Sequence, residues 1–286
     1  MSAFKFLPFA LVASFACSAL VAVHAAPPPV DALRLYTLDC GRVKFKDFGM
    51  FADTGEYDGQ PVEIADPCFV IRHPKGILLW DTGLGDAVAA HADGLASEKS
   101  GIHLRVPVTL ASQLQTLRIA PADVTYLAFS HMHYDHTGNA NLFGASTWIL
   151  DEAELAAATG EPTPHGDDPP TFSAYKRAKK ALIDGDHDVF GDGSVRILKA
   201  PGHTPGHHVL ALRLKNSGTV ILSGDLYHSL DNRAFRRVPA FNVSRADTLA
   251  SIDRIEAIAK NTHARVVIQH AVEDFEKLPK PPAYLD

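Results

Sequence analysis

Cysteine is scarce in this chain, with three among 286 residues. So few thiols argue against a zinc site built from cysteines and against a scaffold held together by many disulfides. An excess of charge of one sign is also missing, because 27 basic residues accompany 33 acidic residues and the formal net charge is -6. Nucleic acid and anionic membranes are therefore not expected as partners. A content of 46% hydrophobic and 21% charged residues is that of a globular chain and excludes collagen, coiled coil and wholesale disorder.

The first 25 residues have the pattern of a secretory signal peptide. One positive charge, Lys5, precedes a mostly apolar run through Val23. We expect cleavage after Ala25, because cleavage after Ala26 would leave a proline at the new N-terminus. An uncleaved membrane anchor is the alternative, since the run is about as long as the ~18-residue minimum for a membrane span. The pattern favours a mature protein, residues 26–286, that is periplasmic or secreted and has no stable membrane insertion.

Signal cleavage would leave two cysteines, Cys40 and Cys68. In an oxidising compartment these two thiols could form a disulfide. Two separate buried thiols fit the sequence equally well, because spacing alone does not establish the geometry that a disulfide requires.

Both halves of residues 26–286 are expected to run strands first and helices later, which predicts an α/β fold in a single domain. Strands are expected at residues 33–38, 69–72, 77–80, 124–129, 146–150, 195–198, 208–214, 219–222 and 265–269. Helices are expected at residues 110–117, 152–158, 172–182 and 245–260. A connector rich in Pro, Gly and Asp, residues 160–170, marks the expected boundary between two halves. The segment 47–67 is predicted to be a long loop, and such loops are usually functional or mobile.

Histidine is abundant, with 15 residues, and its spacing is informative. The segment Ser-His-Met-His-Tyr-Asp-His, residues 130–136, directly follows the expected strand 124–129. His131 and His133 are two residues apart and project to the same side of an extended backbone, while Asp135 and His136 can face a second ion. Imidazole and carboxylate ligands without thiolate suit Zn²⁺, with Fe, Mn or Co as alternatives. Because α/β folds place their chemistry at strand ends, this cluster predicts a metal site.

Three further expected strands also run into residues that can bind a metal. His203 stands within Pro-Gly-His-Thr-Pro-Gly-His, Asp225 follows Ser-Gly, and His270 follows the strand 265–269. Each of these positions alone is a weak signal, since a lone His or Asp after a strand is more often a turn or capping residue. Four such strand ends in this order are a strong one.

This arrangement resembles the metallo-β-lactamase-fold hydrolases over most of the chain, from about Leu33 to the C-terminus. Asp81-Thr82-Gly83 also resembles an early Asp-Thr-Gly element of that superfamily. The resemblance implies a four-layer αββα sandwich of two similar halves with two divalent metal ions at one sheet edge. It implies that one metal is held by His131, His133 and His203, the other by Asp135, His136 and His270, and that Asp225 bridges them.

Asp225 helps to choose among the branches of this superfamily. The zinc β-lactamases usually have Cys or Ser at this position, which argues against β-lactamase activity. A bridging carboxylate at this position resembles the sites of the dinuclear hydrolases, namely lactonases, glyoxalase II-like thioesterases and phosphotriesterases. The segment Gly-Asp-Leu-Tyr-His, residues 224–228, the aromatic residues of the loop 48–58 and the C-terminal His270 look most like the N-acyl-homoserine lactonase family.

That resemblance implies a hydrolase that opens lactone rings, with N-acyl-homoserine lactones, the quorum-sensing signals, as expected substrates. An arylesterase or organophosphate hydrolase of the same fold is the alternative. Two metal ions about 3.5–4 Å apart would lower the pKa of a water towards 7, and Asp135 would orient this nucleophile and carry a proton. The family places a tyrosine three residues after the bridging aspartate. Here Tyr227 is two residues after and His228 is three after, so both are candidates to assist the carbonyl.

An acyl chain needs a pocket with apolar walls. The candidates for these walls are Met50, Phe51, Phe143 and Phe241. For each of them, ordinary core or lid packing is the alternative. By analogy with the family, the loop 47–67 could also form the contact of a homodimer.

Overall fold

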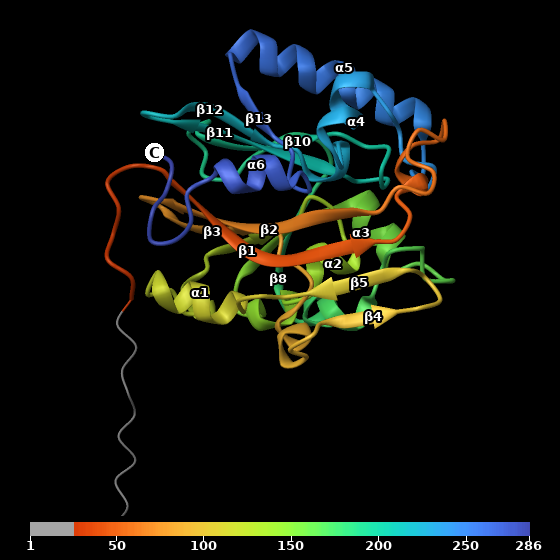
Figure 1. The fold of residues 1–286 in the computed structure, drawn as a ribbon. Coiled ribbons are helices and arrows are strands. Elements are labelled where there is room, and N and C mark those ends of the chain that lie inside the picture. Colours follow the sequence, from red (N-terminus) through yellow and green to blue (C-terminus); the bar gives the residue numbers. More distant parts are fainter. Residues whose placement is uncertain (1–25) are drawn as a thin grey trace, which may run out of the picture.

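A computed structural model describes residues 26–286 and shows two β-sheets packed face to face, with helices on both outer surfaces (Figure 1). This is the four-layer αββα sandwich that the resemblance to the metallo-β-lactamase-fold hydrolases implies. The predicted signal peptide, residues 1–25, lies outside the described residues. None of the helices within residues 26–286 has the length and apolar content that a membrane span requires.

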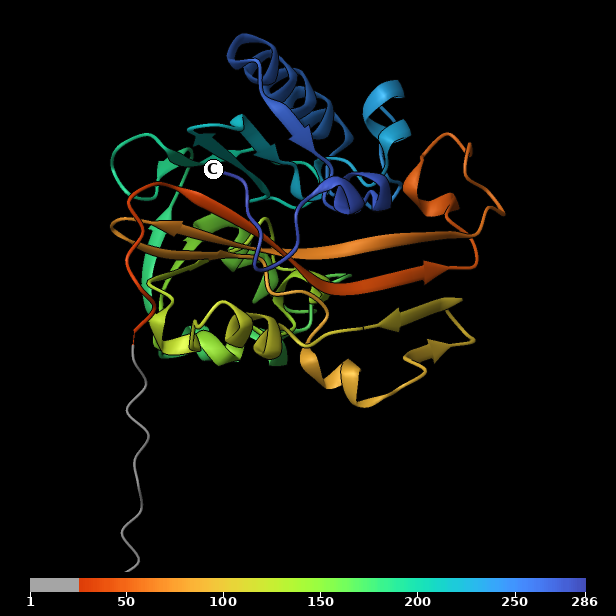
Figure 2. The same cartoon turned by 60° about the vertical axis from the view of Figure 1, so that its left-hand side comes forward.

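The larger sheet has eight strands in the order β4-β5-β1-β2-β3-β6-β7-β8 within the described chain. Its strands are β1 (Arg34–Phe45), β2 (Val62–His73), β3 (Gly76–Trp80), β4 (Leu95–Ser97), β5 (Ile102–Arg105), β6 (Tyr126–Ala128), β7 (Thr147–Asp151) and β8 (Lys179–Ile183). The pairs from β1 to β3 and from β4 to β5 are antiparallel, whereas β3, β6, β7 and β8 run parallel. The short hairpin β4–β5 extends one edge of this sheet (Figure 2).

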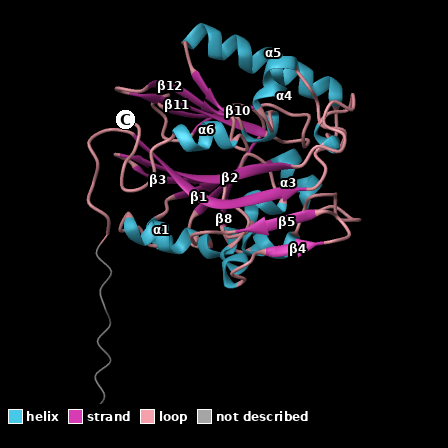
Figure 3. Cartoon of the chain, in the orientation of Figure 1, coloured by secondary structure: helices cyan, strands magenta, loops and turns pink. Residues whose placement is uncertain are grey.

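The smaller sheet has the order β13-β12-β11-β10-β9. Its strands are β9 (His187–Asp188), β10 (Val195–Lys199), β11 (His208–Leu214), β12 (Gly218–Leu222) and β13 (Arg265–Val267). The helices are α1 (Leu110–Thr116), α2 (Tyr134–Thr137), α3 (Glu152–Ala158), α4 (Leu230–Phe235), α5 (Arg245–Thr262) and α6 (Val272–Lys277). Figure 3 shows α4 and α5 on the side of the smaller sheet, and α1 and α3 on the opposite side of the molecule.

The strands of the larger sheet are buried on both faces because both faces are covered. In β2, Phe69 and Ile71 pack in the core between the two sheets, while Cys68 and Val70 pack against the helices beneath. This alternation follows from the two-residue period of a strand. Strands covered on both sides have nearly continuous apolar sequences, which is why residues 69–72 of β2 could be predicted as a strand.

The prediction of a helix at residues 172–182 is wrong. Residues Pro169–Lys176 form 3₁₀ turns, and Lys179–Ile183 form β8, which pairs in parallel with β7. Ala181 and Ile183 are two residues apart and pack against the inter-sheet core, so the strand period is satisfied. The open edge of β7 offers backbone partners that outweigh the local helix propensity of this Lys- and Ala-containing segment.

The expected loop 47–67 is shorter in the structure because β2 begins at Val62. Residues 62–65 pair with residues 42–45 of β1, beyond a register shift between Asp39 and Arg42. Pro67 lies at this irregularity, where a residue without an N–H is tolerated. The irregularity concealed the continuation of both strands in the sequence pattern.

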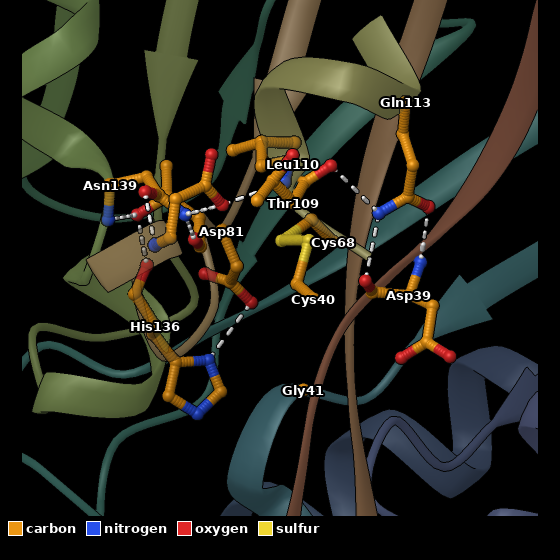
Figure 4. The surroundings of a disulfide bond; sticks show 12 residues. Asp39, Cys40, Gly41, Cys68, Asp81, Thr109, Leu110, Gln113, His136 and Asn139 are labelled. Atoms are coloured by element: carbon orange, nitrogen blue, oxygen red, sulfur yellow. Dashed lines mark hydrogen bonds and ion pairs between the residues drawn. A yellow bond between two sulfur atoms is a disulfide. The ribbon is translucent and has the colours of Figure 1, made fainter. Parts of the chain in front are cut away.

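A disulfide joins Cys40 of β1 to Cys68 of β2, with a Cα–Cα distance of 5.7 Å (Figure 4). Cys40 lies in the register shift, and both cysteines are buried. Gly83 packs so closely on Cys40 that a Cβ on Gly83 would lie 2.3 Å from the Cβ of Cys40. Of the two alternatives in the sequence, the structure has the disulfide, and it braces the turn that follows β3.

Replacing both cysteines with alanine should lower the free energy of unfolding by about 3–4 kcal/mol, because the crosslink then no longer restricts the unfolded chain. The two cysteines are 28 residues apart, so the crosslink closes a loop of intermediate length. Urea denaturation without reductant measures the difference, and the wild-type protein in reductant is the control. Equal midpoints for the oxidised wild type and the double variant would contradict this role.

Candidate metal centre

Four strands end at one edge of the sandwich and bring the predicted ligands together. Residues 130–136 follow β6, His203 follows β10, Asp225 lies in the 3₁₀ turn Gly224–Leu226 after β12, and His270 follows β13. β6 belongs to the larger sheet and the other three strands to the smaller one. The centre therefore forms only when the two sheets pack against each other.

The first cluster consists of His131, His133, His203 and Asp225, whose ligand atoms all lie within 4.8 Å of one another. Nε2 of His203 lies 3.2 Å from both Nε2 of His131 and Nδ1 of His133. The same Nε2 lies 3.3 Å from Oδ2 of Asp225. Three imidazoles and one carboxylate oxygen thus converge on one point.

The second cluster consists of Asp135, His136 and His270, again within 4.8 Å of one another. Oδ1 of Asp225 lies 2.9 Å from Nε2 of His270 and 3.2 Å from Nε2 of His136. Asp225 therefore turns one oxygen towards each cluster. This is the bridging position that the resemblance implies.

Three histidines of the centre are oriented by a hydrogen bond on their outer nitrogen. Nδ1 of His203 lies 2.9 Å from the side-chain oxygen of Asn242, and Nδ1 of His270 lies 2.7 Å from the carbonyl of Ala65. Nδ1 of His136 lies 3.1 Å from a carboxylate oxygen of Asp81. A proton on each Nδ1 leaves the lone pair of Nε2 facing inwards, as in metal-ligating histidines.

The inner atoms of the second cluster fit a cation better than they fit one another. Among the described residues, Nε2 of His136, Nε2 of His270 and Oδ1 of Asp225 are buried without a hydrogen-bond partner. Buried polar atoms of this kind are costly unless a partner satisfies them. Lone pairs of nitrogen and a carboxylate that face one another are the donor set of a divalent transition metal, so the residues of both clusters fit two such ions.

The charge state of these histidines differs between positions. Burial lowers the pKa of His133 and of His203 to about 3, so both are neutral at physiological pH. Burial acts in the same direction on His270, but the adjacent Asp225 carboxylate outweighs it and raises the pKa of His270 to about 9. A cation that binds there at pH 7 must therefore displace a proton.

Asp81, the first residue of the Asp-Thr-Gly element, supports His136 from behind (Figure 4). Its carboxylate accepts hydrogen bonds from the backbone N–H of Ser130 at 2.7 Å and from the side-chain amide of Gln269 at 2.9 Å. Its backbone has a φ of 58°, a left-handed conformation that is uncommon for a non-glycine residue and is typical of functional sites. Asp81 thus connects the loop after β6 with the end of β13.

Asp66 is a buried carboxyl group near the centre that the sequence did not reveal. Within the described chain, neither of its oxygens has a hydrogen-bond partner. Burial, and then the Asp135 charge, raise its pKa well above the usual range. The environment of Asp66 therefore favours its neutral form more strongly than water does.

A cavity of about 510 Å³ opens above both clusters. Met50, Phe51 and Phe241 line it, as the sequence predicts, together with Asp135, Asp225, His133, His228 and His270. Additional walls come from residues that the sequence did not single out, namely Phe45, Ile64, Ser100, Ile102, Tyr134, His165, Gly166, Asp167 and Asp168. The cavity thus has a polar floor and apolar walls, except where Ser100 and the connector residues His165, Asp167 and Asp168 make one stretch of wall polar.

The connector 160–170 forms part of this cavity wall, whereas the chain passes from the larger to the smaller sheet only between β8 and β9. The N–H of Tyr134 donates to the carbonyl of Gly166 at 2.8 Å. Gly166 has a φ of +93°, and a Cβ there would lie 2.6 Å from the ring of His133. Glycine at this position lets the connector lie directly against a predicted ligand.

Two predicted site residues lie elsewhere, and the structure corrects their assignment. Phe143 is fully buried in the core beneath the larger sheet, where its carbonyl accepts a hydrogen bond from Trp148 at 2.9 Å. Tyr227 packs beneath α5 and donates its hydroxyl proton to Glu256 at 2.8 Å. In the part of the chain that the structure describes, neither residue lines the cavity.

The sequence left open whether Tyr227 or His228 faces the substrate, and the structure places His228 at the cavity. Its Nε2 lies 2.9 Å from Oδ2 of Asp225, and it lines the cavity. Its Nδ1 is buried and has no hydrogen-bond partner within residues 26–286. His228 is therefore the one of the two residues that has a polar atom available beside the metal ligands.

Comparisons with known proteins agree with this geometry. The sequence pattern described as the Metallo-beta-lactamase superfamily matches residues 65–270. The N-acyl homoserine lactonase AttM of Azorhizobium caulinodans is 31% identical over 270 residues, which span 89% of this chain and 99% of the relative. The N-acyl homoserine lactonase AiiA of Bacillus thuringiensis subsp. kurstaki is 25% identical over 223 residues, which span 76% and 86%.

Solved structures show the same fold. An N-acyl homoserine lactone hydrolase with the product N-hexanoyl-L-homoserine at its catalytic metal center has a TM-score of 0.75 at 22% identity, over 88% of this chain and 99% of that chain. AidC, a dizinc quorum-quenching lactonase, has a TM-score of 0.64 at 18% identity, over 87% of this chain and 92% of that chain. With its sandwich fold, its two ligand clusters and these matches over most of its length, the chain belongs to the metallo-beta-lactamase superfamily and, within it, to the family of N-acyl homoserine lactonases.

Proposed function

We propose that this protein hydrolyses the ring ester of N-acyl homoserine lactones. The observation that carries this proposal is the position of two histidine and aspartate clusters, joined by Asp225, at the floor of a cavity whose walls are apolar on the side of Met50, Phe51 and Phe241. The floor suits the polar lactone and the walls suit the acyl chain. The relatives that match over most of the chain are named N-acyl homoserine lactonases, which supports the same substrate class.

We propose zinc as the metal, because the donor set combines imidazole and carboxylate without thiolate. His131, His133 and His203 would hold one ion, Asp135, His136 and His270 would hold the other, and Asp225 would lie between them. When bound, two such ions polarise an ester carbonyl and make water a stronger nucleophile at neutral pH.

The residues of this chain would then orient the substrate and move protons. Asp135 belongs to the second cluster and lines the cavity, where its carboxylate can take a proton from water and return it to the alcohol that leaves the ring. Nδ1 of His228 is the free polar atom next to the ligands and would contact the ester group. The rings of Phe51 and Phe241 lie 4.9 Å and 5.7 Å from the ring of His228, so the apolar wall begins directly beside it.

We further propose that residues 1–25 are a signal peptide and that the mature protein acts in the periplasm or outside the cell. The disulfide between Cys40 and Cys68 supports this location, since disulfides persist in oxidising compartments and are rare in the cytosol.

A substrate panel on the zinc-loaded protein tests the activity. We expect the highest kcat/KM for N-acyl homoserine lactones, with lower values for a γ-lactone without an acyl chain, a phosphotriester, nitrocefin and S-lactoylglutathione. Metal-free protein is the control for each substrate. If the lactones are the slowest class, the proposed substrate is wrong, and the fastest class replaces it.

His228→Phe should lower kcat/KM for the lactone by about 10²–10³-fold, because a polar contact to the reacting ester is lost. Bound zinc should remain at two ions per chain. Tyr227→Phe is the matched control, since it removes a hydroxyl that faces Glu256 and should leave kcat/KM within a factor of two. Steady-state kinetics and metal analysis measure both variants. A large loss in Tyr227→Phe with none in His228→Phe would reverse the assignment.

Zinc affinity should rise between pH 7 and pH 9. Protonated His270 cannot bind a metal, and its pKa of about 9 means that the proton must leave before zinc can bind. The apparent affinity therefore increases as the pH rises and levels off above about pH 9. Competition with a chelator of known pH dependence measures this change, and an affinity that is constant or falls over this range would contradict the arrangement.

A further inference from the structure

We propose that Glu154 is a positioning residue for the first metal cluster. Its carboxylate fixes the two loops that carry His131, His133 and His203 at the distance that a single ion requires. This inference rests on the proposed metal function and adds a residue that lies outside the cavity and touches neither ion.

Glu154 lies in the first turn of α3, and only 5% of it is exposed. Its Oε1 accepts a hydrogen bond from the backbone N–H of Met132 at 2.8 Å. Its Oε2 accepts one from the backbone N–H of Gly206 at 2.9 Å. Each carboxylate oxygen is thus used by a different loop, and charge-assisted bonds of this type are among the stronger hydrogen bonds in proteins.

The two amides belong to the ligand loops themselves. Met132 stands between His131 and His133, after a strand of the larger sheet. Gly206 is three residues after His203, in the loop that follows β10 of the smaller sheet. Strands of different sheets share no ladder of hydrogen bonds, so the spacing of these three histidines depends on the packing between the sheets and on contacts between the loops.

Gly206 also shows how closely the second loop lies on α3. A Cβ at this position would come within 2.5 Å of the Cβ of Glu154 and within 2.4 Å of a carboxylate oxygen of Asp151. No side chain fits there without a shift of backbone or helix. The loop of His203 is therefore seated directly on the first turn of the helix that carries Glu154.

Both hydrogen bonds of Glu154 lie beside ligands of the first cluster, although the segment 130–136 also carries Asp135 and His136 of the second cluster. The second cluster has its own supports, because His136 pairs with Asp81 and His270 bonds to Ala65. A second link between the loops of the first cluster exists, since the N–H of His208 donates to the carbonyl of Ser130 at 2.8 Å. Loss of Glu154 should therefore loosen the first cluster without separating the two sheets.

Burying the carboxylate of Glu154 costs free energy, and a side chain that only filled space would avoid this cost. Burial raises the pKa of Glu154, which reflects the loss of hydration of its charge. An apolar side chain would fill the same volume without this cost, but it could not accept two N–H groups from two loops. The position of those two amides is what explains an acidic residue here.

The variant Glu154→Gln tests the inference, because an amide has a single acceptor oxygen and can serve only one of the two loops. The metal-free full chain is titrated with Zn²⁺ against a competing chelator, and the two stepwise affinities are measured. His203→Ala and His270→Ala assign each affinity to a cluster. We expect Glu154→Gln to weaken zinc binding at the first cluster by about 10–100-fold and to leave the second cluster within a factor of three.

Glu152→Gln is the matched control. Glu152 is an acidic residue of the same helix turn, but its side chain is exposed. The same change from carboxylate to amide at this position should keep both zinc affinities. Equal affinities in Glu154→Gln and wild type, or the same loss in Glu152→Gln, would overturn the inference.

Two further outcomes separate the possible failures. If wild-type protein binds no zinc, the proposed function fails before Glu154 is tested. If Glu154→Gln does not fold, Gly206→Ala is measured instead, because it displaces the same loop from the other side. Failure of both variants to fold would also overturn the inference, since Glu154 would then determine the fold and not one metal cluster.

Discussion

The buried carboxylate of Asp225 is the group on which the rest of the site depends. Burial alone would raise its pKa, but the surrounding histidines, with His270 and His228 foremost, hold the pKa of Asp225 well below its usual range. An ionised carboxylate with so little access to water must be compensated by groups that converge on it. The two sheets supply these groups from four strand ends, so the packing of the sandwich and the assembly of the centre are one event.

The residues behind the histidines also orient polar groups towards the centre. His136, His203 and His270 each have an oxygen acceptor on the outer nitrogen, which directs the other nitrogen inwards. Asp81 provides one of these acceptors from a left-handed backbone conformation, and the disulfide lies beneath the turn that begins with it. Such strain persists only where the surroundings determine the conformation, as they do here through several hydrogen bonds.

Substrate choice depends on a different part of the molecule. Met50 and Phe51 come from the segment between β1 and β2, Phe241 precedes α5, and the connector 160–170 closes another side. These are loop residues on a rigid scaffold, the usual place for residues that bind substrate. One fold can support many reactions, so it is the shape and polarity of these walls, and not the fold, that would distinguish a lactone from another ester.

The sequence by itself predicted which histidines and aspartates the fold brings together, because they follow apolar strands and the ends of these strands meet at one edge. The αββα architecture was implied by the resemblance to a known family, and three of the four residues predicted for the apolar walls line the cavity. Only the tertiary structure placed His228, and not Tyr227, at the cavity. The backbone is extended at Tyr227, with φ −142° and ψ 137°, so adjacent side chains project to opposite sides and one of them faces α5. The tertiary structure also excluded Phe143 from the cavity wall. It revealed the role proposed for Glu154, whose hydrogen-bond partners are 22 and 52 residues away, and contacts at such separations leave no local pattern in a sequence.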